Sequence, residues 1–143
     1  MSMIKQLLAN DETLYFIFCD NHILTNSNCE NPTNILITKD VFQKCLDYHC
    51  AKDWFYTPEF NYAAMFIEEG TPKLKDTKWI PVRTFFAINE SISPYVAHGL
   101  SLLNWRSQVR FCSSCGTPLY DHKSETARYC IQCNKNFYQP VSP

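Results

Sequence analysis

The chain has 143 residues, of which 45% are hydrophobic and 15% aromatic, and its formal net charge is −1. A chain this long and this apolar can bury a core, which excludes a disordered class of protein. Because the net charge is close to zero, no overall field attracts the protein to nucleic acid or to an anionic membrane. The only glycines, Gly70, Gly99 and Gly116, are too dispersed for a dinucleotide-binding turn or a P-loop.

Targeting and membrane-spanning segments are not indicated. The apolar residues near the N-terminus are interrupted at Asn10, Asp11 and Glu12 before a signal core can form. The apolar stretch 14–19 is too short to cross a bilayer, and no run of about 18 apolar residues occurs. We therefore expect a soluble cytoplasmic protein with no membrane partner, in which the eight cysteines are metal ligands and core thiols.

The first half of the chain predicts short elements separated by turns. In order, these are a helix near residues 3–9, strands at 14–19 and 23–25 joined by Asp20-Asn21, a loop at 26–34, a strand at 35–38 and a helix at 40–50. The helix is indicated by apolar or partly apolar residues that recur at steps of three and four. These are Val41, Phe42, Cys45, Leu46 and His49.

The second half predicts two more strands, at 62–67 and 79–88, and one long helix. Ser93 would be the N-cap of this helix and Pro94 its first residue, with the helix ending near Trp105. Its buried face would carry Val96, Gly99, Leu100 and Leu103. Strands and helices that do not alternate strictly indicate an α+β domain over residues 1–103.

Residues 104–143 contain two C-x-x-C pairs that predict a zinc ribbon. The pairs are separated by 14 residues, and their cysteines are Cys112, Cys115, Cys130 and Cys133. Each pair can place two sulfurs on one ion, and Gly116 suits the turn after the first pair. Residues 117–120 and 127–129 would form a hairpin held together by the metal.

The alternatives for these cysteines are two disulfides or a redox pair, which the expected cytosolic setting disfavours. Four thiolates leave no open coordination position, so we expect structural rather than catalytic zinc. Cys45 and His49 could share a second metal, although a buried thiol beside a partly buried histidine is the simpler interpretation. His122 is expected to be solvated. The sequence identifies no catalytic residue.

Nucleic-acid binding is the natural alternative for a zinc ribbon. Between residues 104 and 138 the chain has five basic and two acidic side chains, and a zinc ion with four thiolates adds two negative charges. The remaining charge of about +1 is a poor match for a phosphate backbone. A free-standing adaptor that binds nucleic acid or protein therefore stays the second hypothesis.

From Ala97 to Pro143 the sequence resembles the zinc-ribbon segment of Nudix-superfamily NADH pyrophosphatases, the NudC-like NAD diphosphatases. The resemblance rests on a helix that ends at Trp105, the segment F-C-S-S-C-G from Phe111, the second C-x-x-C pair, and the aromatic pair Phe137-Tyr138. It implies a parent enzyme that cleaves the pyrophosphate of NAD(H) or of NAD-capped RNA. It also implies that this chain supports homodimerisation and one wall of the nucleotide pocket.

The resemblance assigns substrate contacts to Glu125, Tyr138 and Arg83. Each has a simpler interpretation: a solvated loop charge for Glu125, a core aromatic for Tyr138 and a surface strand residue for Arg83. One departure lies beside the candidate tyrosine, because the family places proline directly after it whereas this chain has Tyr138-Gln139-Pro140.

A second departure concerns catalysis. The Nudix box, whose glutamates hold the Mg²⁺ or Mn²⁺ that activates water, does not occur in these 143 residues. The family carries it downstream of the ribbon. We therefore expect this chain to be the non-catalytic front part of such an enzyme, inactive by itself and lacking the catalytic domain.

Overall fold

The computed structural model describes residues 13–27, 35–48, 50–68, 74–122 and 127–139. The helix expected near residues 3–9 and most of the loop expected at 26–34 lie outside this described part.

A five-stranded sheet forms the centre of the first 103 residues. Its strands, in spatial order, are β3 (Ala51–Thr57), β4 (Tyr62–Ile67), β1 (Leu14–Cys19), β2 (His22–Asn26) and β5 (Thr77–Pro81). All neighbours are antiparallel except β1 and β4, which run parallel. The predicted hairpin of β1 and β2 is confirmed, with Asp20 at a φ of 53° in its turn.

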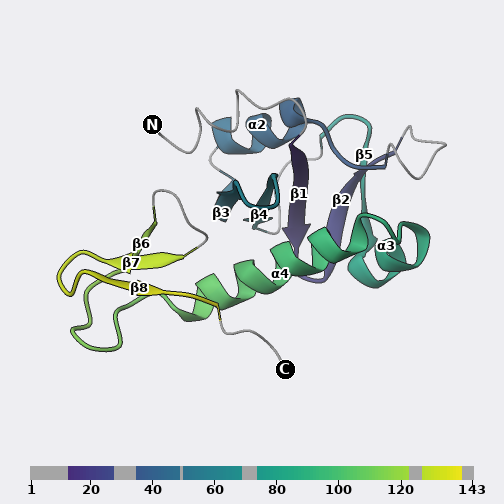
Figure 1. Cartoon of the computed structure of the whole chain (residues 1–143). Helices are drawn as coiled ribbons and strands as arrows, with labels where there is room; N and C mark the ends of the chain where they lie inside the picture. Colours follow the sequence, from purple (N-terminus) through teal and green to yellow (C-terminus); the bar gives the residue numbers. More distant parts are fainter. Residues whose placement is uncertain (1–12, 28–34, 49, 69–73, 123–126, 140–143) are drawn as a thin grey trace.

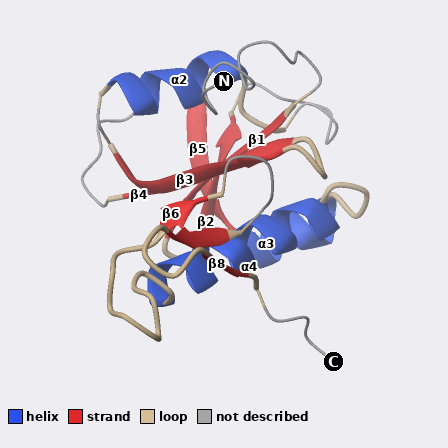
Figure 2. Cartoon of the chain, turned by 60° about the vertical axis from the view of Figure 1, so that its left-hand side comes forward, coloured by secondary structure: helices blue, strands red, loops and turns tan. Residues whose placement is uncertain are grey.

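Helices cover both faces of the sheet, giving three layers (Figures 1 and 2). Helix α2 (Lys39–Asp47) lies on one face, and α3 (Val82–Ile88) and α4 (Ser93–Gln108) lie on the other. Strand β1 supplies both cores, because its successive side chains point to opposite faces. Phe16 and Phe18 join the cluster beneath α3 and α4, whereas Tyr15 and Ile17 join the cluster beneath α2. This explains why β1 is apolar throughout.

A second sheet, of three strands, forms a ribbon that follows α4. It consists of β6 (Tyr120–Asp121), β7 (Arg128–Cys130) and β8 (Lys135–Phe137), with all neighbours antiparallel. In Figure 1 the ribbon lies beyond the C-terminal end of α4. Helices, sheets and the cysteine cluster near the C-terminus confirm the predicted α+β fold class.

The strand expected at 79–88 is only partly present. Strand β5 ends at Pro81, and residues 82–88 form helix α3. Val82 and Phe85 are buried at helical spacing, while Arg83 and Phe86 are exposed. An apolar run this short fits either a strand or a helix by its pattern alone, and Pro81 ends the strand ladder because it has no amide hydrogen.

Other elements also differ from the prediction. Helix α4 begins at Ser93 with Ile92 as its N-cap, so Pro94 is its second residue. The segment 35–38 makes only a single bridge, between Leu36 and Thr25, rather than a full strand. Strand β3 was not predicted, because it is an edge strand whose polar residues and irregular register beside Asp53 obscure the alternation.

Among the described residues, no helix is both long enough and apolar enough to span a membrane.

Candidate metal centre

The four cysteines of the two C-x-x-C pairs converge on one point. All four Sγ atoms lie within 4.8 Å of one another, with Cys112 and Cys133 at 3.9 Å and Cys115 and Cys130 at 3.5 Å. A disulfide would require about 2.05 Å, so these sulfurs are not bonded to each other. Four sulfurs at about 2.3 Å from a tetrahedral zinc would be separated by roughly 3.8 Å. The cluster therefore could hold one metal ion.

Local backbone geometry produces this convergence in the same way at both pairs. The residue after the second cysteine has a positive φ in each case, 76° at Gly116 and 53° at Asn134. These two residue types tolerate that region best. The resulting turns aim amides at sulfur, with the amides of Ser114 and Cys133 each 3.4 Å from the first sulfur of their pair. The predicted role of Gly116 is confirmed, and Asn134 is its counterpart.

The sulfur atoms differ in how readily they lose a proton. Hydrogen bonds from the Thr117 hydroxyl and amide lower the pKa of Cys115 to about 6. Backbone amides of Cys115 and Ser114 lower the pKa of Cys112. The surrounding thiols of Cys115 and Cys112 raise the pKa of Cys133 to about 12. A divalent cation would remove this difference in pKa between the cysteines, because it favours the thiolate at all four positions and releases the protons.

The donor set also indicates what the centre can do. Four thiolates fill a tetrahedron and leave no position for water or substrate, which is the arrangement of a structural zinc site. The core beneath it is small, built from Cys112, Leu119 and Cys130, so we expect metal binding to stabilise the ribbon. Two of the sulfurs belong to exposed residues, Cys115 and Cys133.

The other metal candidates of the sequence are not supported by contacts in the described residues. His49 lies outside them, and Cys45 is buried, which raises its pKa to about 11. That is the behaviour of a core thiol rather than of a ligand. His122 lies with its ring 6.4 Å from that of Tyr129, and it is not part of the cysteine cluster.

Arg106 joins the ribbon to the sheet. Its side chain is only 8% exposed and forms ion pairs with Asp53 of β3 at 2.8 Å and with Asp121 of β6 at 2.6 Å. It also donates to the carbonyl of Trp54. Burial disfavours its charge, but the hydrogen bonds that it donates to Asp53 and Asp121 outweigh this and raise its pKa above the ordinary value. Arg128 of β7 binds Asp121 at 3.0 Å and completes the network.

This network was missed in the sequence, although a signal for it was present. Arg106 follows Val96, Gly99 and Leu103 on the buried face of α4 at steps of three and four. A charged residue at a core position of a helix predicts a buried ion pair. Its partners Asp53 and Asp121 lie 53 and 15 residues away along the chain, so spacing could not identify them.

Of the three proposed substrate residues, the structure describes Arg83 and Tyr138. Arg83 is exposed on α3, and Tyr138 follows β8 with its side chain 55% exposed and its hydroxyl 3.2 Å from the Asn136 amide. Glu125 lies outside the described residues. The exposure of Tyr138 contradicts its interpretation as a core aromatic, because a core ring would be largely removed from solvent.

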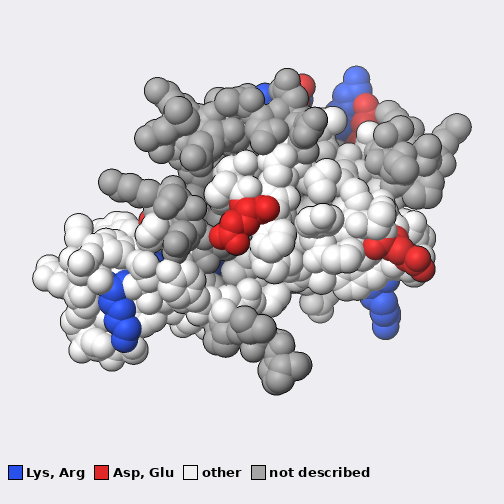
Figure 3. Space-filling model, in the orientation of Figure 1, with Lys and Arg blue, Asp and Glu red and all other residues white. Residues whose placement is uncertain are grey.

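Charged side chains do not form a continuous basic surface on the face shown in Figure 3. Two of the arginines counted in the ribbon, Arg106 and Arg128, are committed to ion pairs with carboxylates. This reduces further the charge available to a long phosphate backbone.

The fold and the cysteine cluster define an α+β protein that carries a four-cysteine ribbon. Comparison with known proteins then finds similarity to bacterial proteins named NAD-capped RNA hydrolase NudC. The chain is 31% identical to that of Stutzerimonas stutzeri (strain A1501) over 67 residues, which is 46% of this chain and 24% of that protein. It is 27% identical to that of Pseudomonas putida (strain W619) over 75 residues, 52% of this chain and 27% of that protein.

A third protein of the same name, from Citrobacter koseri, is 33% identical over 45 residues, 32% of this chain and 18% of that protein. The chain thus spans about a quarter of the length of the first two of these relatives. No family model matches it.

Proposed function

We propose that this chain is the N-terminal α+β domain, residues 1–103, and the zinc ribbon, residues 104–143, of a Nudix-type hydrolase. That enzyme would cleave the pyrophosphate of NAD(H) or of NAD-capped RNA. Two kinds of observation support the proposal: three relatives that share one name, and a cysteine cluster with the geometry of a structural metal site.

In this proposal the ribbon holds structural zinc and performs no chemistry itself. Cys112, Cys115, Cys130 and Cys133 are its ligands. Water activation would depend on Mg²⁺ or Mn²⁺ held by acidic residues of a Nudix box, a motif that these residues do not contain. The protein would act in the cytoplasm, where a reducing environment keeps thiols available for metal.

Substrate contact is proposed for the exposed side chains of Arg83 and Tyr138 and for Glu125. A guanidinium can bind a phosphate through two parallel hydrogen bonds, and an exposed phenol can stack on a base. In this proposal the chain also supports homodimerisation and forms one wall of the nucleotide pocket.

Metal analysis of the purified chain tests the ribbon part of this proposal. We expect one zinc ion per chain, lost when Cys133 is replaced by serine and retained when Cys50 is replaced in the same way. Cys50 is a suitable control because it is not part of the cluster and its thiol lies against the Tyr48 carbonyl. A chain that is free of metal, or oxidised in pairs, would exclude the zinc ribbon.

The enzymatic part is tested by the reading frame that follows the codon of Pro143. A Nudix box downstream supports the hydrolase, whereas a stop codon directly after Pro143 supports the free-standing adaptor. Where the longer protein exists, hydrolysis of NADH by it should require Mg²⁺ or Mn²⁺ and should weaken when Tyr138 is replaced by alanine.

A further inference from the structure

The four cysteines of the ribbon differ in exposure. Cys112 and Cys130, the first cysteine of each pair, are buried, whereas Cys115 and Cys133, the second of each pair, are exposed. Metal binding keeps all four as thiolates, and the thiolate is the form of cysteine that reacts with an oxidant. A small oxidant in solution therefore meets the second cysteine of each pair first.

Hydrogen-bond donors distinguish the two exposed cysteines. The Sγ atom of Cys115 lies 3.1 Å from the hydroxyl oxygen of Thr117, which can donate to the thiolate. The matching position after Cys133 is Lys135, whose ammonium lies over the ring of Phe137 at 5.2 Å from its centroid. In the part of the ribbon that the structure describes, no amide or hydroxyl donates to the Sγ atom of Cys133.

This difference makes Cys133 the more reactive of the two. A hydrogen bond to a thiolate engages a lone pair that would otherwise attack an electrophile, so each donor lowers the nucleophilicity of the sulfur. The buried sulfurs are restrained in the same way, because Cys112 accepts from the amide of Ser114 and Cys130 from that of Cys133, each at 3.4 Å. Cys133 thus combines exposure with a sulfur that no described N–H or O–H group engages.

Cys112 is positioned to complete an oxidation that begins at Cys133. Their Sγ atoms are 3.9 Å apart. A movement of about 2 Å would bring them to the disulfide distance of about 2.05 Å. We propose that Cys133 is a peroxide-sensitive thiolate whose oxidation to a disulfide with Cys112 releases the metal. The inference rests on the structural zinc of the proposed function and goes beyond it, since it gives the ribbon a second, oxidised state.

The reaction needs only hydrogen peroxide and two protons from water. The thiolate of Cys133 attacks one oxygen, the O–O bond breaks, and hydroxide leaves and takes up a proton, which gives a sulfenic acid. The thiolate of Cys112 then attacks this sulfur, the S–O bond breaks, and a second hydroxide leaves and is protonated. Two thiolates lose two electrons, and one peroxide is reduced to two waters. Cys115 and Cys130 are then too few ligands for a stable tetrahedral site.

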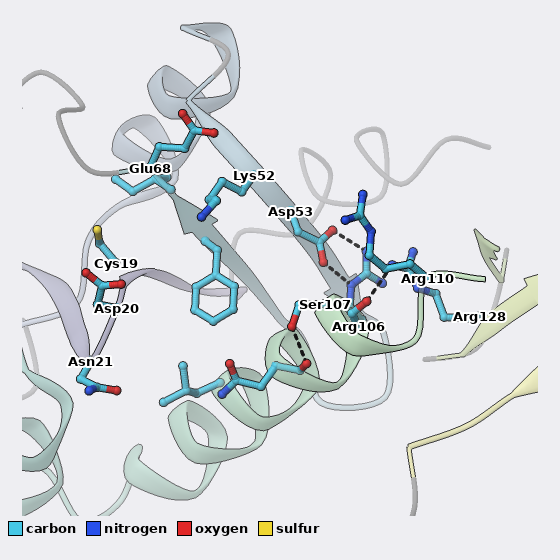
Figure 4. A pocket seen from close by; sticks show the side chains of 14 residues that line it. Cys19, Asp20, Asn21, Lys52, Asp53, Glu68, Arg106, Ser107, Arg110 and Arg128 are labelled. Atoms are coloured by element: carbon cyan, nitrogen blue, oxygen red, sulfur yellow. Dashed lines mark hydrogen bonds and ion pairs between the residues drawn. The ribbon is translucent and has the colours of Figure 1, made fainter. Parts of the chain in front are cut away.

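Metal release acts beyond the cysteines themselves. Strands β6 and β7 carry Asp121 and Arg128, which belong to the ion-pair network around Arg106. Arg128 also lines a groove with a volume of about 1060 Å³ where the sheet, the end of α4 and the ribbon meet (Figure 4). The walls of this groove come from the β1–β2 turn, β3, β4, α4 and β7. Oxidation therefore loosens the ribbon wall of the groove as well as the ribbon itself.

Hydrogen peroxide added to the reduced, zinc-loaded full chain tests the proposal. We expect release of one zinc ion per chain, followed with a zinc-sensitive dye. Dimedone, which captures sulfenic acids, should label Cys133 before any other cysteine of the cluster. Fragmentation mass spectrometry of the linked tryptic peptides 111–123 and 129–135 should find the disulfide between Cys112 and Cys133. Dithiothreitol and added zinc should restore the metal content.

Two variants at residue 135 isolate the effect of a donor. Lys135→Thr places a hydroxyl at the position that Thr117 has beside the other pair, and Lys135→Val has the same shape without the hydroxyl. Because Lys135 is exposed, both variants should keep their fold and their zinc. We expect zinc release from K135T to be about threefold to tenfold slower than from K135V, the effect of at most one hydrogen bond to a charged group.

The possible outcomes separate this inference from the proposed function. Equal release rates in the two variants, or dimedone labelling that begins at Cys115, would overturn Cys133 as the reactive thiolate. Zinc that stays bound in peroxide, or a disulfide that excludes Cys133, would overturn the oxidised state and leave the structural zinc intact. A reduced chain that binds no zinc would overturn the zinc ribbon and this inference together. None of these measurements reads hydrolase activity, so the hydrolase test is unaffected.

Discussion

The contribution of a residue to this protein depends on its surroundings more than on its type. Arg106 and Arg110 are both arginines near the end of α4, yet the first is buried between two carboxylates and the second is exposed. Removing one partner of a buried ion pair leaves an uncompensated charge, whereas an exposed charge contributes little to stability. The two residues therefore have different expected effects on folding.

We expect Arg106→Leu to lower the free energy of unfolding by about 3–5 kcal/mol, because Asp53 and Asp121 lose their shared partner. Arg110→Leu should change it by no more than about 0.5 kcal/mol. Urea unfolding followed by circular dichroism measures both. Similar effects in the two variants would contradict a structural role for the Arg106 network.

His98 makes stability depend on pH. Its Nδ1 lies 2.6 Å from the Tyr62 hydroxyl, and burial lowers its pKa, against the smaller raising effect of Glu59. The unfolded chain therefore binds a proton more readily than the folded one. Stability is fully present above the ordinary histidine pKa near 6.5 and decreases as the pH falls through the folded value.

Unfolding measured between pH 7.5 and pH 5.5 should show this loss in the unchanged protein and a smaller loss in His98→Gln. Glutamine keeps a polar side chain near Tyr62 and does not titrate. An identical pH dependence in both proteins would show that His98 is not the group responsible.

At the scale of helices and strands, packing determines whether a residue with low helix propensity is tolerated in a helix. Helix α4 tolerates Gly99 in its interior because the helix lies directly on β4 there. A Cβ at this position would be 3.1 Å from Cε1 of Tyr62 and 3.4 Å from Cβ of Ala64. Tyr62 is fully buried and is held by His98, so its ring has little freedom to move.

Gly99→Ala should therefore destabilise the protein by about 1 kcal/mol, since overpacking of about 1–3 kcal/mol exceeds a gain in helix propensity of about 1 kcal/mol. The exposed Ala97 on the same helix provides the comparison: Ala97→Gly should cost about 1 kcal/mol through propensity alone. Thermal unfolding measures both. A stabilised Gly99→Ala protein would mean that β4 and α4 can separate slightly at no cost.

At the scale of the whole molecule, two units depend on different stabilising terms. The sheet domain has two apolar clusters, one on each face, whereas the ribbon has a cluster of only three buried residues beneath its cysteines. Apolar burial can hold the first unit, and metal binding would have to hold the second.

Removal of metal by a chelator should therefore unfold the ribbon and leave the sheet domain folded. In NMR spectra we expect the amides of Leu119 and Cys130 to lose dispersion, while those of Phe16 and Met65 keep their positions. Restored zinc should reverse the change. Loss of dispersion throughout the chain would show that the Arg106 network makes the two units one cooperative structure.

The sequence alone determined those features whose signal is local. The hairpin of β1 and β2, the helices α2 and α4, and the grouping of four cysteines follow from periodicity and from fixed spacing, and the structure confirms them. The same local patterns failed at residues 82–88, which fit two kinds of element, and at β3, where an irregular edge strand hides its alternation.

The tertiary structure alone determined the interactions between residues that are distant in the sequence. Asp53 and Arg106 are 53 residues apart, and only the packing of α4 against the sheet brings them to 2.8 Å. The groove likewise combines five separate segments, so no single stretch of sequence carries its pattern. Spacing along the chain predicts contacts within a turn or a hairpin, whereas ion pairs and grooves between elements arise only after the layers have assembled.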